Sequence, residues 1–424
     1  MKTKLIQILY DMRHQPVIAW VTFIATALSI FLIMVVVMMQ QVGITPFAPE
    51  SCRDRLLLGA YLHLTDIGDN QGDSSAGLTF HSARILYSDL EGVERVSYFC
   101  IYKDDSDVKG QQSDAFAVQS RKVDAEFFNI FDHPLVAGRY FTPDEANSLL
   151  PVAVITESTA RRALGDTEWA GAKILIDQKD YTVVGVVNDN STLATTASGD
   201  VFLPIADSDP SVQWDEYLGA ISAALLVKEG VDFQSVRDQV KARYATLDTE
   251  LAPKGQKTVY HEAPFDQETI ASGLHGSNTT PDKNSGRNMR LAIYAILLIV
   301  PAINLSSILH SRMHRRISEI GVRRAFGCTR SRIIADIISE NFIVTLIGGI
   351  VGVTLGVIFA STYSGLYENM DNFGRGDTPA INAIVNWTTI LTAIGICFLL
   401  NIISASIPAW QASRLNPVNA INSK

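Results

Sequence analysis

The chain has 424 residues, of which 47% are hydrophobic and only 19% are charged, and its formal net charge is −9. The apolar residues are concentrated in four segments, so the composition predicts a membrane part joined to a water-exposed part. The net acidity argues against a nucleic-acid-binding protein, because phosphates would be repelled.

Each apolar segment has about the 20 residues that a helix needs to cross the hydrocarbon layer of a bilayer. The first, Val17–Met39, has 23 residues and no charge, which is longer than the apolar part of a cleavable signal peptide. We therefore interpret residues 1–42 as a short interfacial segment followed by an uncleaved span. Further spans are predicted at 289–309, 342–360 and 387–407.

Charges next to these spans predict the orientation of the chain. Residues 310–333 contain seven arginines and a single acid, Glu319, and an excess of Lys and Arg marks cytoplasmic loops. Both termini are then cytoplasmic, and residues 43–288 lie outside. This outer segment has 21 Lys and Arg against 37 Asp and Glu, a net charge of −16, which suits a soluble domain.

The outer segment alternates short strands with helices, a pattern typical of α+β domains. Strands are expected at 53–66, 93–103, 152–156 and 218–228, helices at 79–90, 157–164 and 231–247, and a hairpin turn near Gln178 and Lys179. We expect one lobe from residues 50–120 and 213–265, with residues 121–212 inserted in it as a second lobe. Residues 273–286 are rich in Gly, Ser and Asn and are interpreted as a flexible stretch before the second span.

The predicted fold is therefore a membrane protein with four transmembrane α-helices and a large α+β extracytoplasmic domain between helices 1 and 2. Residues 289–424 form its second domain, with a cytoplasmic loop at 310–333 between spans two and three. The spans hold almost no ionisable residue away from their ends, whereas a path for an ion or charged solute normally needs several.

The most specific motifs lie in residues 289–424. Residues 315–330 read RRISEIGVRRAFGCTR, and residues 408–421 read PAWQASRLNPVNAI. Both resemble elements of the permeases of ABC transporters of the MacB/FtsX family, with Cys328 where that family usually has alanine. In the outer segment, PLVAGRYF at 134–141 and VVGVV at 183–187 resemble the periplasmic domain of MacB. The resemblance implies a multi-pass protein of the bacterial inner membrane with its large domain in the periplasm.

The resemblance also implies that the loop after the second span is a coupling helix that docks on an ATPase. The implied contacts are Glu319, Gly321, Arg323, Arg324 and Gly327. From the residues alone, Gly321 and Gly327 are expected at turns on either side of a short helix. The alternative is that the arginines only set topology and contact lipid headgroups.

The dipeptide Gly-Lys is absent from the chain, so a phosphate-cradling Walker A loop is excluded. The chain is therefore not expected to be an enzyme, and a separate ABC ATP-binding subunit is an expected partner. No cofactor or metal is expected. His310 and His314 have the helical spacing of a metal pair, but neighbouring arginines would repel a cation.

Gly348, Gly352 and Gly356 repeat at four-residue spacing in the third span and allow close helix packing. This packing lies either within one four-helix bundle, which we favour, or at a dimer seam. Cys52 and Cys100 both lie outside and either form a disulfide or remain free thiols, which we favour.

Two functions of different class fit these features. The first is an efflux or export machine for a lipophilic or peptide-like substrate, built from a homodimer or a pair with a related permease, the ATPase and a periplasmic adaptor. The second is an FtsX-like regulator that transports nothing and relays ATPase motion to a periplasmic partner such as a cell-wall hydrolase. The size of the outer domain favours the first.

Overall fold

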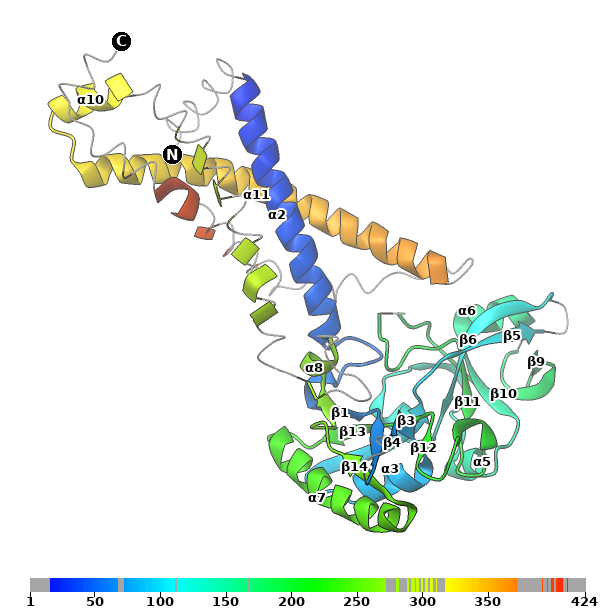
Figure 1. The fold of residues 1–424 in the computed structure, drawn as a ribbon. Helices are drawn as coiled ribbons and strands as arrows, with labels where there is room; N and C mark the ends of the chain where they lie inside the picture. Colours follow the sequence, from blue (N-terminus) through cyan, green and yellow to red (C-terminus); the bar gives the residue numbers. More distant parts are fainter. Residues whose placement is uncertain are drawn as a thin grey trace. The chain divides into compact units, whose positions relative to one another are not determined.

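The computed structural model describes residues 16–67, 72–110, 113–165, 168–191, 193–271 and 317–371, with scattered residues in 280–310 and 391–410. The described residues fall into two compact units. One consists mainly of residues 42–283, and the other contains most of helices α2 (Pro16–Ile44) and α11 (Arg330–Asp371) (Figure 1). The predicted interfacial segment before Pro16, and parts of 289–309 and 387–407, lie outside the described residues.

Helices α2 and α11 cover the first and third predicted spans. Within the part of the chain that the structure describes, no helix combines enough length with enough apolar character to cross a membrane. The four spans therefore stay a prediction.

The unit of residues 42–283 is an α+β domain, as predicted. Its strands are β1 (Leu56–Gly59), β2 (Leu62–Asp66), β3 (Asp73–Leu78), β4 (Val93–Cys100), β5 (Asp104–Lys109), β6 (Phe116–Val123), β7 (Leu135–Gly138), β8 (Val152–Thr156), β9 (Lys173–Ile176), β10 (Lys179–Val187), β11 (Val201–Pro204), β12 (Leu218–Gly219), β13 (Ile221–Val227), β14 (Gln256–Val259) and β15 (Phe265–Asp266). Its helices are α3 (Phe80–Tyr87), α4 (Phe127–Ile130), α5 (Pro143–Asn147), α6 (Glu157–Leu164), α7 (Phe233–Leu251) and α8 (Gln267–Ala271), with 3₁₀ turns at Arg53–Arg55, Pro210–Val212 and Ala252–Lys254.

Six of these strands close into a ring. The pairings run β5–β6, β6–β11, β11–β8, β8–β10, β10–β9 and β9–β5, and β8–β10 and β6–β11 are parallel. Side chains from all six strands and from α6 share one buried apolar cluster. Along β8, Ala153 and Ile155 belong to this cluster while Val152 and Val154 belong to another, because successive side chains of a strand point to opposite faces.

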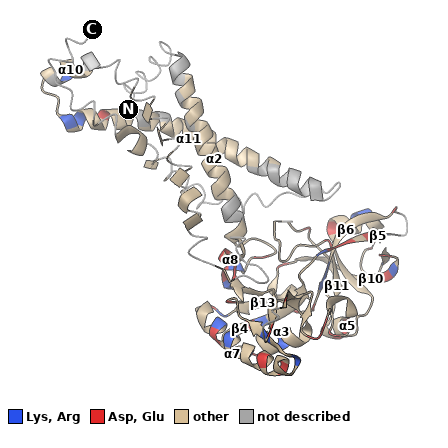
Figure 2. Cartoon of the chain, in the orientation of Figure 1, with Lys and Arg blue, Asp and Glu red and all other residues tan. Residues whose placement is uncertain are grey.

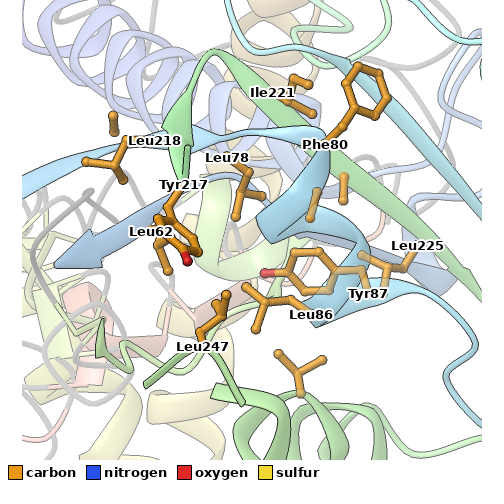
Figure 3. Close-up of a cluster of buried hydrophobic side chains, with 14 of the residues drawn as sticks. Leu62, Leu78, Phe80, Leu86, Tyr87, Tyr217, Leu218, Ile221, Leu225 and Leu247 are labelled. Carbon is orange, nitrogen blue, oxygen red and sulfur yellow. The ribbon is translucent and has the colours of Figure 1, made fainter. Parts of the chain in front are cut away.

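The remaining strands, except β7, which pairs with β10, form a sheet with an apolar layer on each face. Strand β13 lies at its centre and is buried along its whole length. Its residues Ile221, Ala223 and Leu225 pack with α3 and α7, and Figure 3 shows part of this layer. Ala224 and Leu226 point the other way, into the cluster that contains the aromatic rings of α4.

Most predicted elements are confirmed, and their boundaries have physical causes. Strand β8 and helix α6 match their predicted bounds. The β9–β10 hairpin turns at Asp177 and Gln178, whose φ angles of 47° and 65° suit a tight two-residue turn. The single strand predicted at 53–66 is wrong, because a 3₁₀ turn occupies its start and residues 60–61 separate β1 from β2. The two-lobe division stays a prediction.

Gly59 on β1 lies directly against Tyr87 of α3. A Cβ atom placed there would lie 2.3 Å from Cζ of Tyr87, whose side chain is fully buried. We predict that Gly59→Ala lowers the free energy of unfolding by about 1–3 kcal/mol, because the ring has no free space to move into. Thermal unfolding of the full chain measures this loss.

The double variant Gly59→Ala/Tyr87→Leu removes the clashing ring. It should therefore lose less stability than the sum of the two single variants. Additive losses would mean that the Gly59–Tyr87 contact does not limit the packing.

Candidate coupling corner and domain junction

The arginine-rich loop contains a short helix, α10 (Ile317–Ala325), which is followed directly by α11. Gly327 ends α10 with a φ of +91°. The amide of Cys328 donates to the carbonyl of Arg323 at 3.1 Å, which is the hydrogen bond of a glycine-terminated helix end. The turn predicted at Gly327 is confirmed.

We call residues 317–337 the coupling corner. Ile320 of α10 is buried against Ile333 and Ile337 of α11, so the two helices are held in a fixed bend. The opposite side of α10 is open. Phe326 is 88% exposed, and Val322 beside it is 43% exposed. The sequence analysis missed Phe326, although an aromatic residue directly before a helix-ending glycine was a usable signal.

The predicted coupling residues lie on this corner with one correction. Gly321 is not at a turn, since it is buried inside α10 and the helix continues through it. Arg323 is exposed, whereas the side chains of Glu319 and Arg324 lie outside the described residues. Figure 2 shows basic residues at α10 and at the first turn of α11, while most of α11 and α2 is uncharged.

The glycines of the third predicted span bring α11 against α2. A Cβ atom at Gly352 would lie 2.7 Å from the carbonyl oxygen of Ala27, and one at Gly356 would lie 3.2 Å from Cβ of Met34. Gly348 is also buried. Small residues allow two helix backbones to approach this closely. Helix α11 therefore packs closely against α2 at these glycines.

The beginning of the 42–283 unit lies against the segment that ends at Ala271. Gln267 Nε2 donates to the carbonyl of Gly43 at 2.8 Å, and a Cβ atom at Gly43 would lie 2.9 Å from Cβ of Ala271. Arg237 of α7 also holds this segment, because its Nη2 donates to Oδ2 of Asp266 at 2.8 Å. The segment that follows α2 and the segment that ends at Ala271 are thus held together.

The chain leaving α2 is also attached to a loop far away in sequence, residues 193–198. Glu50 and Arg53 are both buried and form an ion pair at 2.6 Å. The other oxygen of Glu50 accepts from the amides of Thr196 and Ala197 at 2.8 and 2.9 Å, and Arg53 donates to the carbonyl of Leu193 at 3.3 Å. We call this arrangement the junction clamp.

Arg121 lies on β6, one of the six strands that close into a ring, and binds the same loop. Its guanidinium donates to the carbonyls of Thr195, Ser198 and Cys100, each at 3.1 Å. Burial lowers the pKa of Arg121 to about 10, with Cys100 and Glu50 opposing the shift, so the group stays charged at neutral pH. The loop is therefore bound by cations through its carbonyls and by a carboxylate through its amides.

The cysteines of this region are free thiols, as favoured from the sequence. Cys52 donates to the carbonyl of Ile130 at 3.3 Å, and Cys100 is buried on β4. Burial, followed by the charge of Asp132, raises the pKa of Cys52 to about 11. A thiol with so high a pKa is a poor nucleophile at neutral pH.

Comparison with known proteins decides the family. The MacB-like periplasmic core domain matches residues 20–243, just over half of the chain, and the FtsX-like permease C-terminal domain matches residues 291–417. The chain belongs to the MacB/FtsX family of ABC transporter permeases. The coupling corner lies within the FtsX-like part of this permease, and the junction clamp lies within the MacB-like part.

The relatives are distant and longer than this permease chain. It is 25% identical to a probable export ATP-binding/permease protein MacB of Pseudomonas entomophila, over 95% of this chain and 58% of that protein. It is 24% identical to a probable syringafactin export ATP-binding/permease protein, SyfD, of Pseudomonas syringae pv. tomato, over 84% of this chain and 51% of that protein. The chain thus spans about half the length of the curated relatives it matches.

Among solved structures, the periplasmic region of MacB from Actinobacillus actinomycetemcomitans matches 52% of this chain and 94% of that one. The sequence identity is 16% and the TM-score is 0.35.

The junction clamp generates a stability prediction. Arg53→Met leaves the Glu50 carboxylate buried without its cation, which should cost about 3–5 kcal/mol. The double variant Glu50→Gln/Arg53→Met should lose less, because no unpaired charge remains. Thermal unfolding of the full chain in detergent measures both.

The matched control is Arg84→Met, which removes an exposed ion pair with Asp207. This change should cost less than about 1 kcal/mol. Equal losses for Arg53→Met and Arg84→Met would contradict a buried, stabilising clamp.

Proposed function

We propose that this chain is the permease subunit of an ABC transporter that receives motion from a separate ATP-binding subunit in the cytoplasm and passes it to the 42–283 domain in the periplasm. The observation that carries the proposal is the coupling corner. A ring that is 88% exposed stands at a rigid bend beside exposed Arg323, and an exposed aromatic next to an arginine is typical of the centre of a protein interface.

The proposal places the chain in the bacterial inner membrane with both termini in the cytoplasm. Family membership supports it. So does helix α2, which contains no charged residue and carries an exposed apolar face formed by Val21, Ile24, Leu28 and Leu32. Such a face is better solvated by lipid than by water. The proposed assembly is a homodimer, or a pair with a related permease, bound to ATPase subunits.

The proposed route of motion follows contacts between named residues. Displacement of the coupling corner moves α11, which carries Ile333 and Ile337. Helix α11 moves α2 through the contacts at Gly352 and Gly356. The chain leaving α2 then pulls on the loop at 193–198 through Glu50 and Arg53. Each step relies on a close or buried contact, which transmits displacement because packed interiors are hard to compress.

The proposed cargo is a lipophilic or peptide-like molecule that is exported with a periplasmic adaptor. Relatives named as exporters of macrolides, syringafactin and pyoverdine support this substrate class. Efflux, rather than regulation of a periplasmic enzyme, is the function that these names favour.

We predict that Phe326→Ser and Arg323→Ala each reduce binding of the ATP-binding subunit by about tenfold or more, because an exposed aromatic or arginine at an interface centre often contributes over 2 kcal/mol. The measurement is the amount of ATP-binding subunit that co-purifies with the tagged chain in mild detergent.

Arg95→Ala is the matched control, since it removes an exposed positive charge from β4, which lies outside the coupling corner. It should retain the ATP-binding subunit. If Phe326→Ser and Arg323→Ala both retain the subunit at the parent level, the contact residues are wrong. If the folded parent chain recovers none, the proposed partnership is wrong.

A further inference from the structure

Two histidines far apart in the sequence form a hydrogen bond at the edge of the sheet. His63 lies on β2 opposite Val259 of β14, and His261 follows Val259 two residues later. Nδ1 of His63 lies 2.7 Å from Nε2 of His261. His63 is buried, whereas His261 is partly exposed. The bond therefore attaches the chain beyond β14 to a buried side chain of β2.

The outer nitrogens of the pair set the direction of the ring protons. Nδ1 of His261 lies 2.7 Å from Oγ1 of Thr280. Nε2 of His63 faces a carboxylate oxygen of Asp73 at 3.6 Å. A proton on Nε2 of each ring satisfies all three contacts, because Thr280 then donates to His261 and His261 donates to His63. The Nε2–H group of His63 points toward the carboxylate in this arrangement.

The hydrogen-bonded pair can hold one added proton but not two. A first proton fits on Nδ1 of His261, because the hydroxyl of Thr280 can turn and accept from it. A second proton would have to bind Nδ1 of His63, where it would meet the Nε2–H group of His261 at 2.7 Å. Two positive rings in contact also repel each other. The hydrogen bond is therefore incompatible with double protonation.

The shift in the pKa of His261 has the sign that this geometry requires. Burial, and then the charge of His63, lower that pKa from its ordinary value of 6.5. A histidine whose pKa is lowered by folding stabilises the folded state above about pH 6.5, and this stabilisation is lost as the pH falls further. The pair is therefore closed at neutral pH and destabilised in acid.

The other charged groups near the pair, among the residues that the structure describes, do not remove this repulsion. Asp73 and the exposed Glu262 favour the first proton, whereas Lys257, on the same face of β14, opposes it. Tyr61 on β2 stays neutral, because burial raises the pKa of its phenol. Helix α7 packs against the opposite face of β2, with the apolar side chains of that strand. None of these groups can separate the inner nitrogens, which are in direct contact.

We propose that the hydrogen bond between His63 and His261 is an acid-sensitive latch, which is closed at neutral pH and opens when both imidazoles are protonated. When closed, the latch holds Thr280 to β2 through the two rings. Opening releases both contacts, because His261 takes part in each of them.

The latch acts on the stretch of chain between the two family domains. The MacB-like match ends at residue 243 and the FtsX-like match begins at residue 291, so Thr280 lies in the connection between them. Acid therefore loosens this connection where it is attached to the sheet. A consequence for transport rests on the proposed function, whereas the latch itself does not.

The test is hydrogen exchange of the full chain in detergent, without an ATP-binding subunit, at pH 7.5 and pH 5.5. Each rate is divided by the intrinsic chemical rate at the same pH, and the signal is read from residues 256–263. Opening of this segment in the parent should rise by up to about tenfold at pH 5.5, the limit for one proton taken up over one pH unit below 6.5. His261→Gln should lose this pH response. His81→Gln, which changes a half-exposed histidine paired with Glu250, should keep it.

Thr280→Val keeps the test informative even if a histidine variant fails to fold, because Thr280 is exposed. At pH 7.5 this variant should raise opening of residues 256–263 by about threefold to tenfold, the effect of one lost hydrogen bond. Equal pH responses in the parent and in folded His261→Gln, or parental exchange in Thr280→Val, would overturn the latch. Since no ATP-binding subunit takes part, that result would leave the proposed function standing.

Discussion

The structure depends on a buried charge that must be fully satisfied. Glu50 has no solvent exposure, and a carboxylate in such a place costs several kcal/mol unless a cation and hydrogen-bond donors surround it. Arg53 supplies the cation, and the amides of Thr196 and Ala197 supply the donors. The loop at 193–198 therefore has to adopt one conformation, and the chain leaving α2 has to stay attached to it.

The loop at 193–198 is held by more than the Glu50–Arg53 pair. Arg121 of β6 binds the same loop. The ring of six strands and the segment after α2 therefore share one polar network. The returning segment is held beside Gly43 by Gln267. At the coupling corner, buried isoleucines hold α10 against α11 and leave Phe326 exposed.

Local signals in the sequence predicted the elements well, and long-range contacts escaped them. Strand β8 and helix α6 follow from apolar alternation and from amphipathic spacing. The short helix after the second predicted span was expected from its arginines and glycines, but Gly321 was misplaced because glycine also suits a buried position inside a helix. The Glu50 clamp lies about 146 positions from its loop, and His63 lies 198 positions from His261. No periodicity connects residues so far apart.

The central claim is that ATP-driven movement reaches the 42–283 unit through the junction clamp. Hydrogen exchange of the chain in lipid nanodiscs, together with its ATP-binding subunit, tests this claim most directly. The account predicts that trapping the ATP-bound state changes amide protection in residues 43–55 and 193–198, where Glu50 binds two backbone amides. Unchanged protection there, with clear changes in α10 and α11, would contradict the claim.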